Sequence, residues 1–321
     1  MAAEQWKTLP CVAQPVAPVC PIAYTEEYIQ VFDRVRGVLA SGDRDQRVLD
    51  LTAIAVELSP AHYTAWQLRR ECLAANKIDP VKELEFCSLI GRDNPKNYQV
   101  WHHRLQVLFM HPSPKSLVVE ELRFIELMLS DDAKNYHAWT YRQWLLTHFP
   151  DVLWDDELER MNTMLDLDVW NNSAWNQRYF ILFNRPDKVL ADLPAIIGEL
   201  TWTLERIKMA PTNEAPYNYI LGLSRRYPKD LVPLIGKYCL DAIGTAFERR
   251  ISHPKDLPNP ASIMLLRTIV ELMEEHGVII SLWNNSWPEI TSWALQLLKS
   301  MDSVRENYWI WVEERLSLSP I

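Results

Sequence analysis

The sequence is poor in glycine and lacks the cysteine patterns that stabilise secreted proteins or hold zinc. Gly accounts for only 8 of 321 residues, which argues against a turn-rich β fold. The cysteines are Cys11, Cys20, Cys72, Cys87 and Cys239, an odd number with no C-x-x-C spacing. Because such a set does not build a disulfide framework, we expect reduced thiols in a cytoplasmic protein.

Long basic runs and long apolar runs are also missing. The formal net charge is −9, and no run of Lys and Arg exceeds two residues, so we expect no nucleic-acid partner. No apolar run approaches the roughly 18 residues of a membrane span. Residues 1–22 lack the basic start and the apolar stretch of a secretory signal. Their four prolines predict an extended, Pro-rich N-terminal tail that lies along a partner.

The usual catalytic motifs are absent as well. The sequence has no G-x-S-x-G elbow, no Walker loop and no dinucleotide fingerprint. His102 and His103 are adjacent, so on a helix they point about 100° apart and do not share a metal easily. We therefore expect no metal bound by this chain alone. If the protein is catalytic, its site must be completed by another subunit.

What the sequence does contain is a repeated motif. In the segment 93–109, Asn97 is followed by Trp101 and then by Arg104, at offsets of four and seven residues. The set recurs as Asn135/Trp139/Arg142 and Asn171/Trp175/Arg178, begins imperfectly as His62/Trp66/Arg69 and ends as Asn213/Tyr217/Ile220. The key aromatic residues lie at positions 66, 101, 139, 175 and 217, so the intervals are 35, 38, 36 and 42 residues. A recurrence of this period predicts stacked supersecondary units.

Each unit is expected to be a helical hairpin. Offsets of four and seven place the motif on one face of an α-helix. We expect caps at Ser59, Asn94, Asp132 and Asp168, which would put the motif Asn in the first helical turn. Apolar stripes between the motifs predict the second helix, at 118–129 and 154–165 for example. The predicted fold is all-α: a curved solenoid of hairpins over residues 23–321, which begins with two helices at 24–40 and 45–58 and is closed by an irregular C-terminal cap after 228.

Residues that are identical in every repeat build the repeat, so we interpret Asn, Trp and Arg as structural. Function is expected where repeats differ. The residue after the motif Asn is Tyr98 and Tyr136 in two repeats, and Tyr63 holds this place in the first. The residue before it is Lys96 and Lys134. A Lys in a first helical turn opposes the helix dipole, which hints at an anion bound nearby.

At these residues the sequence resembles a known family. The segments PKNYQVWHHR at 95–104, AKNYHAWTYRQW at 133–144 and NNSAWNQRYF at 171–180 resemble the repeats of protein prenyltransferase α subunits, and NEAPYNYI at 213–220 resembles their fifth repeat. Within that family the resemblance is strongest to the α subunit shared by protein farnesyltransferase and geranylgeranyltransferase type I. It implies a crescent-shaped, right-handed α–α superhelix wrapped around a β subunit, with the α subunit active only as part of that heterodimer.

The resemblance also implies roles for particular residues. Lys96 would be catalytic, contacting the diphosphate of farnesyl or geranylgeranyl diphosphate and stabilising its developing charge. Tyr98, Tyr136 and His137 would line the diphosphate and the first isoprene. Gln99 would bind the C-terminal carboxylate of a CaaX protein, such as a small GTPase, and Ala61 and Tyr63 would border its last residue. Zinc would be bound by the β subunit, and Mg is possible for the holoenzyme.

Two alternatives stay open from the sequence. One is the α subunit of Rab geranylgeranyltransferase, which tends to carry Ser or Phe where Tyr98 and Tyr136 stand here. The other is a helical-repeat scaffold without a catalytic role. The sets Lys96/Tyr98/Gln99 and Tyr136/His137 argue against a scaffold, which has no reason to keep them together.

Overall fold

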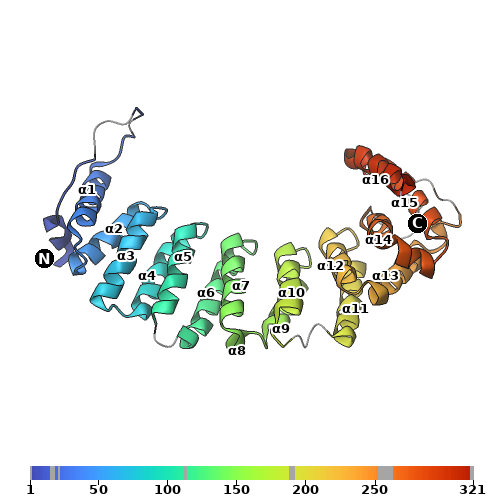
Figure 1. The fold of residues 1–321 in the computed structure, drawn as a ribbon, viewed down its shortest axis with the longest axis horizontal. Helices are drawn as coiled ribbons and strands as arrows, with labels where there is room; N and C mark the ends of the chain where they lie inside the picture. Colours follow the sequence, from blue (N-terminus) through green and yellow to red (C-terminus); the bar gives the residue numbers. More distant parts are fainter. Residues whose placement is uncertain are drawn as a thin grey trace. The chain divides into compact units, whose positions relative to one another are not determined.

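The computed structural model describes residues 2–14, 19–20, 22–111, 114–187, 192–249, 251 and 263–318 (Figure 1). These residues form helices and turns, with no strand among them, as the sequence predicts. The chain divides into two compact units, Met1–Asp155 and Asp156–Ile321. Within the residues described, we find no helix long and apolar enough to cross a membrane.

The first unit contains three hairpins, and in each the helix called second above comes first in the chain and the motif helix follows it. Its helices are η1 (Ala2–Thr8), α1 (Glu26–Ser41), α2 (Gln46–Leu58), α3 (Tyr63–Asn76), α4 (Pro80–Asp93), α5 (Tyr98–Met110), η2 (Pro114–Ser116), α6 (Val118–Asp131), α7 (Tyr136–His148) and α8 (Pro150–Leu153). The pairs α2–α3, α4–α5 and α6–α7 pack as hairpins, and the motif helices α3, α5 and α7 pack on one another in series (Figure 1). The core of each hairpin is therefore shared with the next.

The second unit continues the pattern and then departs from it. Its helices are α9 (Glu157–Leu167), α10 (Asn172–Asn184), α11 (Leu193–Met209), α12 (Glu214–Arg226), α13 (Pro228–Ile243), η4 (Gly244–Ala246), α14 (Ile263–Trp283), α15 (Trp287–Met301), η6 (Ser303–Arg305) and α16 (Glu306–Leu318). The pairs α9–α10 and α11–α12 are hairpins of the repeat, whereas α13–α16 pack consecutively. Within the cap, α14 contains non-helical backbone at His276.

The position of the helix caps differs from the prediction. The motif Asn is itself the N-cap: Asn97 accepts the backbone N–H of Gln99 at 2.8 Å, and Asn135 accepts that of His137 at 3.0 Å. The expected capping positions lie instead in the turn before the helix. Lys96 therefore precedes the helix rather than sitting in its first turn, although it remains close to the positive end of the helix dipole.

The motif Trp explains the position of the cap, because its indole N–H binds a carbonyl oxygen of the turn before the helix. The indole of Trp101 donates to the carbonyl oxygen of Pro95 at 2.9 Å. The same bond, six residues back, is made by Trp66, Trp139 and Trp175 at 2.7, 3.0 and 2.8 Å, and by the hydroxyl of Tyr217 at 3.2 Å. All five aromatic side chains are buried. Each buried ring thus finds the polar partner it needs in the turn that precedes its own helix.

The N-terminal residues also differ from the predicted extended tail. Residues 2–8 form the 3₁₀ helix η1, and Trp6 and Leu9 are buried in the core formed with α1 and α2. The backbone of Pro10 approaches Gly37 of α1 so closely that a Cβ at Gly37 would meet its carbonyl oxygen. The two apolar side chains cover the open end of the hairpin array, where a terminal repeat has no neighbour. Pro15, Pro18 and Pro21 lie outside the described residues.

Candidate functional site

Three exposed tyrosines mark the N-termini of the motif helices in the first unit. Tyr63, Tyr98 and Tyr136 are the first residues of α3, α5 and α7, and they are 72%, 67% and 66% exposed. Each follows directly after its capping residue, so the cap geometry turns the ring outward. Large exposed aromatic side chains on packed, successive helices are typical of a surface that binds something.

Lys96, Tyr98, Tyr136 and His137 come together at the ends of α5 and α7. The ring of Tyr98 meets the ring of His137 edge-on, with centroids 4.2 Å apart, and Tyr136 meets it at 5.6 Å. Partial burial lowers the pKa of His137, although a hydrogen bond from its ring to the backbone carbonyl of Lys96 opposes this. The imidazole is therefore neutral at pH 7. The ammonium of Lys96 lies 3.2 Å from Asp132 and its side chain is 73% exposed.

The physical character of this cluster suits an anion. Two helix N-termini contribute backbone N–H dipoles, Lys96 contributes a positive charge, and the tyrosine and histidine rings contribute polar edges. Tyrosine rings also offer apolar faces to the carbon atoms next to such an anion. The cluster can hold a charged group attached to an apolar chain.

The remaining predicted residues lie at neighbouring helix N-termini. Gln99 follows Tyr98 on α5 and is half-buried, and its backbone N–H is used by the Asn97 cap. Ala61 is exposed in the turn before α3, and Tyr63 begins that helix. Since α3 packs on α5, the three residues border the same row of helix ends as Lys96.

Buried carboxylates, which the repeated motif does not predict, join one repeat to the next. The carboxylate of Glu121 on α6 accepts hydrogen bonds from Nε and Nη2 of Arg104, at 3.0 and 2.5 Å. It also accepts one from the hydroxyl of Tyr141 at 2.7 Å. Arg104 and Tyr141 belong to successive motif helices. In the preceding repeat, Glu83 binds Arg69 and His103 in the same way. In the second unit, Glu199 binds Arg178 and Tyr219, and Glu157 accepts a hydrogen bond from Gln177. The motif Arg is therefore structural, as predicted.

A sequence signal for these carboxylates exists. Each Glu is followed by Leu, in the pairs Glu83-Leu84, Glu121-Leu122, Glu157-Leu158 and Glu199-Leu200. Each lies 18 residues before the next key aromatic, since 101 − 83, 139 − 121, 175 − 157 and 217 − 199 are all 18. The pattern repeats as regularly as the tryptophans do.

One buried group in the first unit has the composition of a metal site. Ligand atoms of Glu83, Cys87 and His103 all lie within 4.8 Å of one another. His103 Nε2 is only 2.8 Å from Glu83, which also holds Arg69 through both oxygens. His103 occupies the place that Tyr141 and Tyr219 take in other repeats, where the side chain donates to the Glu. Because burial raises the pKa of the Cys87 thiol, its thiolate is disfavoured. The geometry favours a structural hydrogen-bonded group.

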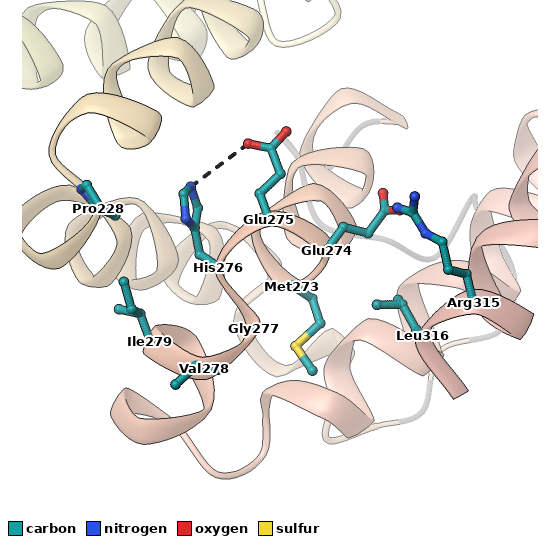
Figure 2. A pocket seen from close by; sticks show the side chains of 10 residues that line it. All are labelled: Pro228, Met273, Glu274, Glu275, His276, Gly277, Val278, Ile279, Arg315 and Leu316. Atoms are coloured by element: carbon teal, nitrogen blue, oxygen red, sulfur yellow. Dashed lines mark hydrogen bonds and ion pairs between the residues drawn. The ribbon is translucent and has the colours of Figure 1, made fainter. Parts of the chain in front are cut away.

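A hollow of about 620 Å³ lies in the second unit (Figure 2). Figure 2 shows Glu275 and His276 at the bend of α14 and Arg315 of α16 beside Glu274. The acidic groups are already paired, Glu274 with Arg315 and Glu275 with Arg225. His276 is bonded to Ser224 at 3.2 Å. These side chains stabilise the packing of α12, α14 and α16 and do not converge on the hollow as a reactive set.

Comparison with known proteins bears on the repeat. The sequence model of the protein prenyltransferase alpha subunit repeat matches residues 45–76, 80–111, 118–149 and 154–185. These ranges coincide with the pairs α2–α3, α4–α5, α6–α7 and α9–α10. In each match a second helix is followed by a motif helix.

Individual relatives agree with this assignment. The chain is 34% identical over 223 residues to the Candida albicans protein farnesyltransferase/geranylgeranyltransferase type-1 subunit alpha, covering 67% of this chain and 71% of that protein. It is 42% identical over 79 residues to the tomato (Solanum lycopersicum) protein of the same description, a match that spans 25% of this chain and 23% of the tomato protein. A chain in the structure of Candida albicans protein geranylgeranyltransferase-I complexed with GGPP superposes with a TM-score of 0.80 and 26% identity, covering 96% of this chain and 97% of that one. On the strength of the repeat, the shared length and the fold, the chain belongs to the family of protein prenyltransferase α subunits.

Proposed function

We propose that this chain is the α subunit of a heterodimeric CaaX protein prenyltransferase. The holoenzyme transfers a farnesyl or geranylgeranyl group from its diphosphate to the Cys of a C-terminal CaaX motif. The observation that carries the proposal is the cluster of Lys96, Tyr98, Tyr136 and His137 at the ends of α5 and α7. A scaffold gains nothing from exposing these aromatic rings beside a lysine.

In this proposal Lys96 is the catalytic residue of the chain. Its ammonium contacts the diphosphate, whose negative charge grows as the bond to the isoprene carbon breaks. The hydroxyls of Tyr98 and Tyr136 donate hydrogen bonds to the same oxygens. The neutral His137, whose one N–H is taken by the Lys96 carbonyl, lines the site between the two tyrosine rings. The tyrosine faces cover the first isoprene unit and exclude water from the departing group.

The peptide binds beside this cluster. The side-chain amide of Gln99 donates to the C-terminal carboxylate of the CaaX protein, which the helix N-termini also favour. Ala61 and Tyr63, at the end of the preceding motif helix, border the last residue of the peptide. The small side chain of Ala61 leaves room there, while Tyr63 limits it.

Activation of the reacting thiol as a thiolate calls for a metal ion. The only described set of His, Cys, Asp and Glu close enough to bind a metal is the saturated Glu83 group. Following the family resemblance, we place zinc on the β subunit, where it would activate the substrate Cys as a thiolate, and Mg remains a candidate for the holoenzyme. The proposed partners are the β subunit, farnesyl or geranylgeranyl diphosphate, and CaaX proteins such as small GTPases, in the cytoplasm.

Co-expression with candidate β subunits tests this function. The chain is produced with the β subunit of farnesyltransferase, of geranylgeranyltransferase type I or of the Rab-directed enzyme, and each mixture is purified through the α chain. We expect a stable complex with one of the first two that prenylates a CaaX peptide. A complex with only the Rab-directed β subunit would establish that alternative. Stable complexes without transfer activity would support a scaffold and contradict the proposal.

A further inference from the structure

Asp132 holds the ammonium of Lys96 from the turn between α6 and α7. One carboxylate oxygen lies 3.2 Å from Lys96 Nζ. The other oxygen accepts the backbone N–H of Lys134 at 3.1 Å. The backbone N–H of Asp132 donates to Met128 at 3.1 Å as the C-cap of α6. The carboxylate is thus fixed by the turn, whereas Lys96 reaches it on a flexible stem.

The pair joins two repeats at the candidate site. Lys96 precedes α5, and Asp132 precedes α7, whose first residues are Tyr136 and His137. The backbone carbonyl of Lys96 also accepts the hydrogen bond from His137. Lys96 is therefore held at both ends, by His137 at its backbone and by Asp132 at its ammonium.

Stability does not account for this pair. The side chains of Lys96 and Asp132 are 73% and 37% exposed, and exposed ion pairs add little to folding. The hydrogen bonds from the Lys134 backbone and from Lys96 lower the pKa of Asp132, so the carboxylate stays ionised at neutral pH. A permanent negative charge beside an anion site weakens binding of the anion in the ground state. The turn bond to the Lys134 N–H is one role of this carboxylate, as it is for Asp168 one repeat later, and the ion pair gives it a second contact that orients the lysine.

We propose that Asp132 is a positioning residue that holds the Lys96 ammonium over the leaving diphosphate. The inference rests on the proposed function, because it acts through Lys96. A lysine carries its ammonium on a flexible four-carbon stem with many rotamers. An ion pair to a fixed carboxylate selects the rotamer in which the remaining ammonium protons face the cluster. Orientation of this kind acts on the chemical step more than on binding.

Asp132→Asn in the α–β complex is the test. The amide oxygen still accepts the Lys134 N–H, so the turn is kept while the ion pair is lost. We expect the single-turnover rate of prenyl transfer to fall about tenfold. The dissociation constant of the isoprenoid diphosphate should stay the same or decrease, because a repelling charge is gone. The melting temperature should not change.

Asp168→Asn is the matched control. Asp168 is the C-cap of α9, and its carboxylate accepts the N–H of Trp170 at 2.9 Å, so it performs the same turn role one repeat later. We expect wild-type rates from this variant. Equal rates for the Asp132 and Asp168 variants would overturn the inference.

A double-mutant cycle separates this inference from the proposed function. Asp132→Asn should slow the reaction in the native background and have no further effect on the rate when Lys96 is already Ala. An equal rate loss in both backgrounds would show that Asp132 does not act through Lys96. If Lys96→Ala slows transfer but Asp132→Asn does not, the inference fails and the proposed function stands. If Lys96→Ala leaves the rate unchanged, both fail.

Discussion

At the scale of the residue, the carbonyl oxygen before a motif helix links neighbouring repeats by accepting two hydrogen bonds. The carbonyl of Pro95 accepts the indole of Trp101 at 2.9 Å and the amide of Asn135, the next motif Asn, at 3.0 Å. In the second unit the carbonyl of Val169 accepts Trp175 at 2.8 Å and Asn213 at 2.7 Å. A carbonyl has two lone pairs, so both bonds can form at once. The motif Asn therefore caps its own helix through its side-chain oxygen and donates from its amide to the turn of the preceding repeat.

Trp139→Ala is expected to lower the free energy of unfolding by about 3–5 kcal/mol, because it removes a large buried ring. Trp139→Phe keeps most of the apolar area but leaves the carbonyl of Ala133 without the indole, and we expect a loss of about 1 kcal/mol. Urea unfolding of both variants in the α–β complex measures the difference. A Trp139→Ala variant that melted like wild type and lost only activity would contradict the structural role.

Lys96→Ala is expected to slow single-turnover prenyl transfer by roughly 10²–10³, the usual effect of removing a group that stabilises charge in the transition state. The affinity for isoprenoid diphosphate should weaken far less, since the charge on the leaving group grows only as the bond breaks. Lys134→Ala is the control, because Lys134 precedes its motif Asn in the same way. Small and equal effects from both variants would show that Lys96 is an ordinary surface lysine and would contradict its catalytic role.

At the scale of the element, the second helix of each hairpin is held by its buried Glu. Glu121 is 2% exposed and binds Arg104 of its preceding motif helix and Tyr141 of its following one. Burial lowers the pKa of Arg104, but the Glu121 carboxylate more than offsets this and raises it. The guanidinium also lies 3.8 Å from the ring centroid of Phe124 on α6. The carboxylate fixes the stacking of three helices at one point.

Glu121→Gln tests this arrangement. It is isosteric but leaves Arg104 charged and buried without a counter-ion, and we expect a loss of about 3 kcal/mol in the free energy of unfolding. Glu120→Gln, on the same helix, breaks only an exposed pair with Arg123 and should cost less than about 1 kcal/mol. Chemical unfolding of the two variants side by side is the measurement. Equal losses would mean that burial of the pair is not what matters.

The first unit should lose stability in mild acid because of His103. Burial lowers the pKa of His103, against the opposing effect of its hydrogen bond to Glu83. The folded ring therefore binds a proton less readily than the unfolded one, whose pKa is about 6.5. Stability from this residue is complete above that pH and is lost as the pH falls below it. We expect the melting temperature to drop between about pH 7 and pH 5.

His103→Gln is the matched variant, because Gln177 already makes the same contact with Glu157, at 2.9 Å. The variant should keep the hydrogen bond to Glu83 and reduce the slope of melting temperature against pH. His62, His102 and His137, and His276 of the second unit, also have lowered pKa values and contribute to the slope that remains. An unchanged slope would exclude His103 as a source of the acid sensitivity.

At the scale of the whole molecule, each of the two units has its own packed helices, and the chain still exposes many large apolar side chains. Besides the three tyrosines, Trp170 is 52% exposed, Phe109 51% and Trp311 49%. Exposed apolar surface of this kind marks interfaces or leads to aggregation. We expect the isolated chain to have low solubility and to form a stable 1:1 complex with its β subunit. Size-exclusion chromatography with light scattering checks this, and a monodisperse lone chain with cooperative melting would contradict it.

Much of the fold could be predicted from local pattern. The offsets of Asn97, Trp101 and Arg104 indicate a helix, and their recurrence indicates stacked hairpins. The caps were misplaced by a few residues because Asn94 and Asp132 are equally good capping residues on paper. The bond from Trp101 to the Pro95 carbonyl, which decides between them, is visible only in three dimensions. The packing of Trp6 on α1 and α2 was likewise hidden, since the prolines after it dominate the local signal.

By itself, the sequence determined the all-α repeat and the row of tyrosines, because both follow from spacing along the chain, and it indicated the family through the resemblance of its repeated segments. The tertiary structure decided which side chains meet across repeats. Glu83 meets Arg69 of the preceding motif helix, and Lys96 meets Asp132 of the next repeat, because successive motif helices pack side by side. Helical periodicity specifies the face on which a side chain lies but not the residue of the next hairpin that it faces. That register follows from the packing of buried rings and carboxylates between hairpins, and it brings Lys96, Tyr98 and His137 into one cluster.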